Sequence, residues 1–345
     1  MPFTTNDRKA LAFSGAAKYH QQGYKGHGIN IGVIDSGIND HPELTRRIRY
    51  DLGRNFCTVA TDAASLQEDD ARNGGHGTAV ASLIAGLNCG VAPMATVTPL
   101  KVFNGLMECT DEWIIAALNY VRTNADKFDI INMSLGTQTY SFAMEQAVNA
   151  VVAAGIPVIV SAGNSGDERH QYPACFEQVI SVGAVDIDKQ RATYTTMCDE
   201  VDLCQVGTDI KVAALSGDYT TMSGTSFAAP IVSGVASLIA CKFKSLFGRR
   251  ILETVLYEAL KLSSIDVDIP GIDKASGVGL CTLGAGRHVL FAGGSTEYRI
   301  DGEPRQLDSP MIYVNNRTML PARYLAEALG SEIFANGDNT VSIIG

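Results

Sequence analysis

The chain has 345 residues, of which 46% are hydrophobic and 19% are charged, a composition typical of a folded globular protein rather than a disordered one. Its 27 Lys and Arg stand against 37 Asp and Glu, for a net charge of −10, and no basic cluster points to a nucleic-acid partner. The longest apolar runs, around residues 150–162 and 227–241, are interrupted by Gly or Pro and are too short to span a bilayer. The sequence therefore predicts neither a nucleic-acid nor a membrane partner.

The N-terminal stretch MPFTTNDRKALAFSG is polar and lacks the apolar core of a signal peptide. No two cysteines form a C-x-x-C pair, so neither a zinc ribbon nor a thioredoxin-like site is indicated, and free thiols are favoured over disulfides. These features predict a cytoplasmic protein, with an extracellular location as the alternative if a leader or prodomain was removed. The eight cysteines are residues 57, 89, 109, 175, 198, 204, 241 and 281.

From residue 29 onward, short apolar segments alternate with segments of helical periodicity. This alternation predicts an α/β fold: a doubly wound, mainly parallel sheet covered by helices on both faces. In such sheets, functional groups gather at the carboxyl ends of the strands. Strands are predicted at residues 29–34, 96–102, 130–134, 157–162 and 179–185, and helices at residues 77–87, 111–121, 142–154 and from 226 onward.

Four polar residues stand where these elements begin or end. Asp35 follows the first strand, His76 opens a helix, Asn164 follows the strand at 157–162, and Ser226 lies at or beside the start of an apolar helix. Taken singly, capping or structural roles are commoner, and an N-capping serine is the simple alternative for Ser226. Taken together, a nucleophile, a base, an acid that fixes the base's tautomer and an oxyanion donor are the groups that peptide-bond hydrolysis needs.

The blocks VIDSG, GGHGTAVAS and SGTSFAAP, in the order Asp–His–Ser, resemble the subtilisin-like serine proteases, the subtilases. The resemblance runs from about residue 15 to 283 and includes HPEL, GVAP, NMSLG, SAGNSG, YPA and VISVGAVD. It implies that Ser226 is the nucleophile, His76 the general base and acid, and Asp35 the residue that orients the imidazole. It also implies that Asn164 donates to the oxyanion with the Ser226 N–H, that the substrate is a peptide or protein, and that no cofactor is required.

The same matching implies a substrate site. The substrate is expected to lie extended along one strand edge, and the pocket for the residue before the scissile bond is expected to have Gln171 at its floor. Family members that accept large apolar residues commonly have glycine there, so Gln171 predicts a preference for medium or polar residues over Phe and Tyr. The strand edge comprises Ser134, Leu135 and Gly136, and one pocket wall comprises Ser161, Ala162 and Gly163.

Two departures from the family pattern stand out. Phe227 follows the serine where members usually carry Met, and the short segment GLNCGVAP lacks the extended loop that holds a tight calcium ion in secreted relatives. The resemblance implies a weaker candidate site for Ca²⁺ or a monovalent cation, and an empty turn is the alternative. Its candidate ligands are the carbonyls of Ala174, Phe176 and Val179 and the carboxylate of Asp202.

After about residue 294 the sequence changes character, with short strand-like pieces, a turn at 315–316, a helix near 321–329 and a closing strand. The core NNRTMLPARYLAEALG resembles the small stalk module named after the N-terminal part of copper amine oxidases, but no His cluster supports a copper site. The predicted organisation is a subtilisin-like peptidase domain at 1–293 and a small α+β module at 294–345. The module is a candidate contact for a partner or another subunit.

Three functions are compatible with the sequence: an active endopeptidase, a catalytically silent scaffold of the same fold, and a protease dedicated to maturing one precursor. Silent relatives usually lose one member of the catalytic set, and here all four are present. The sequence therefore favours the active endopeptidase.

Overall fold

The computed structural model describes residues 7–57, 63–72 and 74–283, with the backbone alone for part of 63–72. Beyond them it describes strand backbones at 289–291, 297–300, 303–306, 312–314, 317–319, 332–335 and 341–344. The predicted turn at 315–316 and helix near 321–329 lie outside the described residues.

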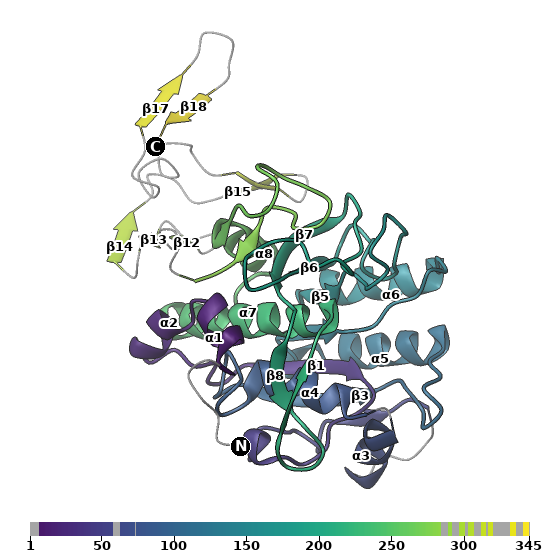
Figure 1. Ribbon diagram of the computed structural model, residues 1–345. Coiled ribbons are helices and arrows are strands. Elements are labelled where there is room, and N and C mark those ends of the chain that lie inside the picture. The colour runs from purple at the N-terminus through teal and green to yellow at the C-terminus, as the bar shows by residue number, and fades with distance from the viewer. Residues whose placement is uncertain are drawn as a thin grey trace.

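A central sheet organises the chain, with strand order β10–β11–β7–β6–β5–β4–β1–β3–β2. Its neighbouring strands pair in parallel, except that β10 and β11 are antiparallel. This confirms the predicted mainly parallel sheet (Figure 1). The strands are β1 (Asn30–Asp35), β2 (Arg54–Asn55), β3 (Thr96–Lys101), β4 (Ile130–Met133), β5 (Val158–Ser161), β6 (Ile180–Val185), β7 (Val201–Val206), β10 (Ser264–Ile265) and β11 (Leu280–Cys281).

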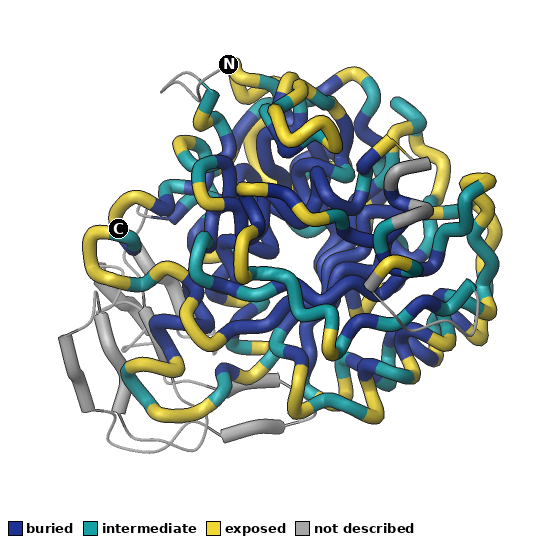
Figure 2. The backbone as a smooth tube through the Cα atoms, turned by 90° about the horizontal axis from the view of Figure 1, so that it is seen from below, coloured by how far each residue is buried: buried dark blue, intermediate teal, exposed yellow. Residues whose placement is uncertain are grey.

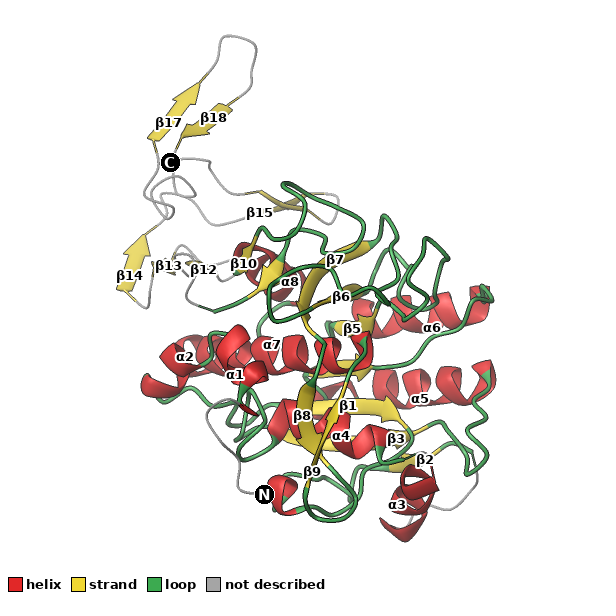
Figure 3. Ribbon diagram, in the orientation of Figure 1, coloured by secondary structure: helices red, strands yellow, loops and turns green. Residues whose placement is uncertain are grey.

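Helices cover both faces of this sheet (Figure 3). On one face α4 (His76–Ala85) packs against α7 (Thr225–Phe247), and on the other α5 (Asp111–Thr123) packs against α6 (Phe142–Ala153). Side chains of β1 alternate between the two resulting cores: Ile31 and Val33 join the α4–α7 core, and Ile34 joins the α5–α6 core. Figure 2 shows the buried residues concentrated in the interior between these layers. The doubly wound fold is confirmed.

The crevice of the sheet lies at β1. After this strand the chain adds β3 on one side of it and β4 on the other, so the strand order reverses here. Ligands of doubly wound sheets bind at such a point, outside the carboxyl ends of the strands. Asp35 ends β1 and Ser134 follows β4, so both lie at this crevice.

Helix α7 is the central packing element of its face. It is long and apolar enough to cross a membrane, but 94% of its apolar window is buried inside the protein, so its hydrophobicity serves the core. The helix begins at Thr225, and its N-cap is Gly224, which has a φ of 150° and makes no side-chain cap. The N-capping alternative for Ser226 is therefore wrong, because Ser226 is already the second residue of the helix.

Several elements were not predicted from the sequence. They include the helices that precede β1, the helix that carries Asp70, a hairpin beside α4 and a helix packed on α7. The C-terminal strands pair as β12–β13–β14, β15–β16 and β17–β18. The elements whose bounds remain to be given, some of them within the predicted strand-like C-terminal stretch, are α1 (Lys9–Phe13), α2 (Ala17–Gln21), α3 (Ala63–Arg72), β8 (Ile210–Ala213), β9 (Tyr219–Met222), α8 (Glu253–Leu262), β12 (Val289–Phe291), β13 (Glu297–Ile300), β14 (Glu303–Gln306), β15 (Ile312–Val314), β16 (Arg317–Met319), β17 (Glu332–Ala335) and β18 (Val341–Ile344).

Candidate active site

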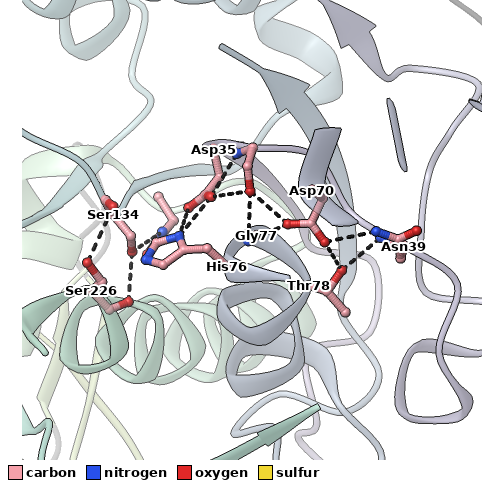
Figure 4. A network of polar contacts seen from close by, with 10 residues as sticks. Asp35, Asn39, Asp70, His76, Gly77, Thr78, Ser134 and Ser226 are labelled. Carbon is pink, nitrogen blue, oxygen red and sulfur yellow. Dashed lines mark hydrogen bonds and ion pairs between the residues drawn. The ribbon is translucent and has the colours of Figure 1, made fainter. Parts of the chain in front are cut away.

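Asp35 and His76 meet across the crevice. Asp35 is 1% exposed, and His76 Nδ1 lies 2.9 Å and 3.1 Å from its two carboxylate oxygens (Figure 4). The Ser36 N–H donates to Asp35 Oδ1 at 2.7 Å and fixes the carboxylate further. A carboxylate facing Nδ1 keeps the proton on that nitrogen, which leaves Nε2 as the basic position of the neutral ring.

A second buried carboxylate, Asp70, supports this pair. It accepts hydrogen bonds from Ser36 Oγ at 2.7 Å, the Gly77 N–H at 2.8 Å and Asn39 Nδ2 at 3.0 Å, and also from the Thr78 hydroxyl. Ser36 Oγ also donates to Asp35, so one hydroxyl links the two acids. Asp70 therefore ties α3 to β1 and to the start of α4. Nothing in the sequence analysis had identified it.

The charges around His76 favour its protonated form. Burial by itself lowers the pKa of His76, but the charge and hydrogen bond of Asp35, with the charge of Asp70 behind it, raise it above its ordinary value overall. Some 27% of the His76 side chain remains exposed, so its free edge is reachable from outside. An imidazolium formed here during a reaction is stabilised by both acids.

Ser226 lies beside His76 and Ser134 (Figure 4). Its Oγ donates to the Ser134 carbonyl at 3.4 Å, and Ser134 Oγ donates to the Ser226 carbonyl at 2.9 Å. The Ser226 carbonyl is available because the helical donor four residues later would be Pro230, which has no N–H. The proline thus frees a backbone acceptor through which β4 positions the serine.

A buried polar ladder continues this contact into the core. Ser233 Oγ of α7 donates to Asn132 Oδ1 at 2.9 Å, and Asn132 Nδ2 donates to Ser134 Oγ at 3.0 Å. These side chains join α7 to β4, and satisfied buried polar groups of this kind fix one relative position of two elements. The sequence signal was a polar Asn132 within an otherwise apolar strand.

Asn164 is oriented by the residue before Ser226. Its Oδ1 accepts from the Thr225 N–H at 2.9 Å and from Thr225 Oγ1 at 3.0 Å. The Gly163 N–H in turn donates to Thr225 Oγ1 at 3.1 Å. Thr225 thus holds the carbonyl end of the Asn164 side chain. The amide Nδ2 makes no hydrogen bond to any described residue, and it is free to donate to a ligand.

Gln171 lies between the two segments predicted to form the pocket. A Cβ on Gly136 would be 3.6 Å from Gln171 Oε1, and a Cβ on Gly163 would be only 2.6 Å from Gln171 Cγ. Gly163 has a φ of +105°, so both its conformation and this approach require glycine. The structure thus brings Gln171 between the strand edge at 134–136 and the segment at 161–163.

Phe227, the departure from the family's usual methionine, is 3% exposed. Its ring lies 5.6 Å from the His76 ring, centroid to centroid, in a tilted arrangement. An aromatic pair at this distance is favourable. Phe227 therefore packs against the imidazole from α7.

The candidate cation ligands are less well suited to their role. Asp202 Oδ2 accepts from the Ser181 N–H at 2.8 Å, and its Oδ1 accepts from the Tyr257 hydroxyl. The Val179 N–H donates to the Phe176 carbonyl at 3.3 Å, while Ala174 is a buried neighbour on the same turn. Burial raises the pKa of Asp202 to about 6, against the opposing bond from Tyr257. The carboxylate is already engaged, and this donor set does not fit a tightly held cation.

The chain resembles known proteins over most of its length. Residues 26–279 match the subtilase family model, and residues 274–344 match the copper amine oxidase N-terminal domain. Subtilisin DY of Bacillus licheniformis is 36% identical over 241 residues, which is 67% of this chain and 83% of that protein. An intracellular serine protease of Paenibacillus polymyxa is 36% identical over 272 residues, covering 76% and 81%.

A solved structure agrees with these sequence matches. The crystal structure of a cold-adapted subtilisin-like serine proteinase has a TM-score of 0.67 and 29% identity, and the match covers 75% of this chain and 90% of that one. The matches support a hydrolase that acts on peptides or proteins, in a family that generally needs no cofactor but often binds calcium. The chain belongs to the subtilase family of serine endopeptidases.

Proposed function

We propose that this chain cleaves peptide bonds through Ser226, His76 and Asp35, with Asn164 in the oxyanion hole. The observation that carries the proposal is the double contact of His76 Nδ1 with Asp35, which leaves Nε2 basic on the side where Ser226 lies. The raised pKa of His76 is consistent with a base that must hold a proton during the reaction.

The chemistry proceeds in two halves. Ser226 Oγ attacks the scissile carbonyl carbon while His76 Nε2 takes its proton, and the carbonyl oxygen becomes an oxyanion that Asn164 Nδ2 and the Ser226 N–H stabilise. The C–N bond then breaks, His76 gives its proton to the leaving amine, and an ester to Ser226 remains. Water, deprotonated by His76, attacks the ester, and the acid product leaves with Ser226 protonated again.

The substrate is proposed to lie extended along Ser134, Leu135 and Gly136, paired through its main chain. Its residue before the scissile bond enters between Gly136 and Gly163 and meets Gln171. A glutamine amide left unpaired against an aromatic ring is penalised, so medium or polar residues are favoured there. Support comes from the position of the Gln171 side chain between these two glycines.

The test is Ser226→Ala, assayed with a peptide library and a serine-directed fluorophosphonate, and read by mass spectrometry. Turnover should fall by about six orders of magnitude, a figure taken from the corresponding serine of subtilisin. The label should sit on Ser226 of the unmodified chain and be absent from the variant. Ser223→Ala, at an exposed serine three residues earlier, is the matched control and should keep both the turnover and the label on Ser226.

The alternative of a silent scaffold predicts no cleavage and no label on Ser226 in the unmodified chain. A dedicated maturation protease instead predicts labelling together with cleavage of very few library peptides. A broad cleavage profile with labelled Ser226 supports the general endopeptidase.

Three further points remain proposals. A cytoplasmic location is supported by eight cysteines that are all free thiols, and is tested by fractionating the source cells. A weak cation at Ala174, Phe176 and Val179 would rest on carbonyls, because Asp202 is engaged; the metal content of the purified chain tests it. The C-terminal module is proposed to contact a partner, which sedimentation with and without residues 294–345 tests.

A further inference from the structure

Two cysteines and a glutamate meet behind the pocket residue Gln171. Cys175 lies in the loop between β5 and β6, and Cys198 and Glu200 precede β7. The two Sγ atoms are 3.0 Å apart. One ligand atom from each of the three residues lies within 4.8 Å of the others. The cluster is formed by two chain segments that the parallel sheet brings together.

Glu200 is the unusual member of this cluster. Its Oε2 atom is buried and has no hydrogen-bond partner among the residues that the structure describes. The Cys198 N–H donates to the Lys274 carbonyl, but the Lys274 ammonium turns to Glu168 and Asp199 instead of Glu200. A buried carboxylate oxygen without a partner is costly, so its partner must come from outside the described chain.

The two thiols are already in contact, because Cys175 Sγ donates a hydrogen bond to Cys198 Sγ. A cation that displaces the thiol protons would therefore find two sulfur ligands side by side.

We propose that Cys175, Cys198 and Glu200 bind a thiophilic divalent cation, Zn²⁺ in particular, with a fourth position left to water. Binding releases the thiol protons to solvent, and two thiolates, one carboxylate and the dication carry a net charge of −1. Zinc–sulfur bonds of about 2.3 Å in a tetrahedron place the two sulfurs about 3.8 Å apart, so they need to separate by only about 1 Å.

The choice of zinc follows from the ligands. Thiolates select soft or borderline cations over Ca²⁺ and Mg²⁺, which prefer oxygen. A disulfide between the cysteines would require an external oxidant and would leave the Glu200 oxygen buried without a partner. A bound cation gives that oxygen its partner, so the third residue of the cluster favours the metal.

The proposed site is coupled to the substrate pocket through the backbone. The Cys175 N–H donates to the Gln171 carbonyl at 2.8 Å, and the Gln171 N–H donates to Cys175 Sγ at 3.4 Å. A cation that fixes Cys175 would also hold the turn carrying Gln171. Zinc loading is therefore expected to change KM more than kcat, an effect that rests on the proposed function.

The test uses the full, fully reduced chain titrated with Co²⁺, whose thiolate charge-transfer and ligand-field bands report tetrahedral sulfur ligation, followed by displacement with Zn²⁺. One equivalent should bind. Cys175→Ser and the nearly isosteric Glu200→Gln should each weaken binding by more than about 100-fold. Each removes a direct ligand, and even the loss of a group that only hydrogen-bonds to a ligand weakens metal binding by about 10–100-fold. Cys241→Ser, a buried thiol of α7, is the control and should bind as the unmodified chain does.

Two results would overturn the proposal. One is equal Co²⁺ and Zn²⁺ binding by the unmodified chain and by folded Glu200→Gln, with folding checked by circular dichroism. The other is a Cys175–Cys198 disulfide in the isolated protein with no stoichiometric zinc binding after reduction. Neither readout depends on catalysis, so failure here is distinct from failure of the proposed active site.

Discussion

Two acids beside the active site, Asp70 and Glu200, have opposite surroundings. Asp70 accepts four hydrogen bonds from its neighbours, whereas Glu200 has a buried oxygen that no described residue contacts by a hydrogen bond. Asp70 belongs to the triad side of the site, which we define as residues 35–39, 70, 76–78 and 226. Glu200 belongs to the pocket side, residues 162–179 and 196–202.

The difference shows which groups have their hydrogen bonds satisfied within the protein and which are expected to contact a substrate or a cation. On the triad side, internal hydrogen bonds fix a geometry that must be the same for every substrate. On the pocket side, a substrate or a cation is expected to supply the missing contact. The groups concerned are Asn164 Nδ2, the Gln171 side chain and the Glu200 carboxylate. Perturbing the triad side should therefore affect every substrate alike, while perturbing Gln171 should affect some substrates and spare others.

Asn164→Ala is the strongest test at the boundary of the two sides. Asn164 lies on the pocket side but is oriented by Thr225, and its Nδ2 is proposed to donate mainly in the transition state. We expect kcat to fall by about 10²–10³ for all substrates, as for the corresponding asparagine of subtilisin. Steady-state kinetics measure this, with the exposed Asn119→Ala as control. A change in KM alone would remove Asn164 from the oxyanion hole.

Gln171→Gly should separate substrates instead. Removing the side chain that lies between Gly136 and Gly163 deepens the pocket and removes an amide that an aromatic ring leaves unpaired. The kcat/KM for Phe relative to a medium polar residue should rise by about 10–200-fold. Competition between paired peptides measures the ratio, and His170→Gly, an exposed neighbour in the same loop, should leave it unchanged. An unaltered ratio in Gln171→Gly would show that this side chain does not set the preference.

Much of the triad side could be predicted because its residues stand at the ends of strongly patterned elements. Asp35 ends an apolar strand, and His76 and Ser226 open apolar helices, so local sequence places them at one crevice. Asp70 could not be found in this way. Its helix α3 has the largely polar sequence AASLQEDDAR, in which Leu66 is a lone large apolar residue and no hydrophobic period is visible.

The pocket side was harder to predict because its contacts join distant segments. Cys175 and Cys198 are 23 residues apart, and nothing in that spacing resembles a metal motif. Asp202 was matched to a cation ligand, but one of its oxygens is occupied by Tyr257 of α8, a helix that the sequence analysis did not predict. The sequence showed the chemistry of each residue, but it did not show which distant residue each one contacts.

Asp70→Asn tests whether the triad side is held by its internal bonds. An amide nitrogen in place of one oxygen would face a donor, Asn39 Nδ2 or the Gly77 N–H, and leave it unpaired. We expect a loss of about 1–3 kcal/mol in the free energy of unfolding, measured in a Ser226→Ala background to prevent autolysis. In the active chain kcat should fall by roughly tenfold for every substrate, because one of the hydrogen bonds that hold β1 and the start of α4 together is lost.

The pH profile of the same variant distinguishes positioning from simple destabilisation. Catalysis needs neutral His76, so activity is lost as the pH falls through the pKa of His76. The charge of Asp70 contributes to raising that pKa, and its removal should shift the acidic limb of kcat/KM to lower pH. The exposed Asp126→Asn should leave the limb in place. An unshifted limb in Asp70→Asn would mean that its charge does not reach the imidazole.

The smallest expected effect concerns Glu253, which opens α8 and lies near Asp202 at the far end of the pocket side. Burial, with the charges of Asp202 and Glu258, raises the pKa of Glu253 from 4.5 to about 7. A folded-state pKa above the unfolded one means that the folded chain binds the extra proton. The stability that this group contributes is therefore complete below pH 4.5 and is lost as the pH rises through 7.

Glu253→Gln should remove this dependence. In a Ser226→Ala background, its melting temperature should match that of the parent near pH 4 and exceed it by a few degrees at pH 8, because the neutral amide avoids burying a charge beside Asp202. The gain is limited, since a negative charge in the first turn of α8 also interacts favourably with the helix dipole, by about 0.3–1 kcal/mol. Scanning calorimetry from pH 4 to 8 measures the difference, with Glu177→Gln, an exposed residue whose charge is not among the causes of the Glu253 shift, as control. Parallel curves for Glu253→Gln and its parent would show that Glu253 is well compensated beside Asp202, and the contrast between the two sides would then be confined to Glu200.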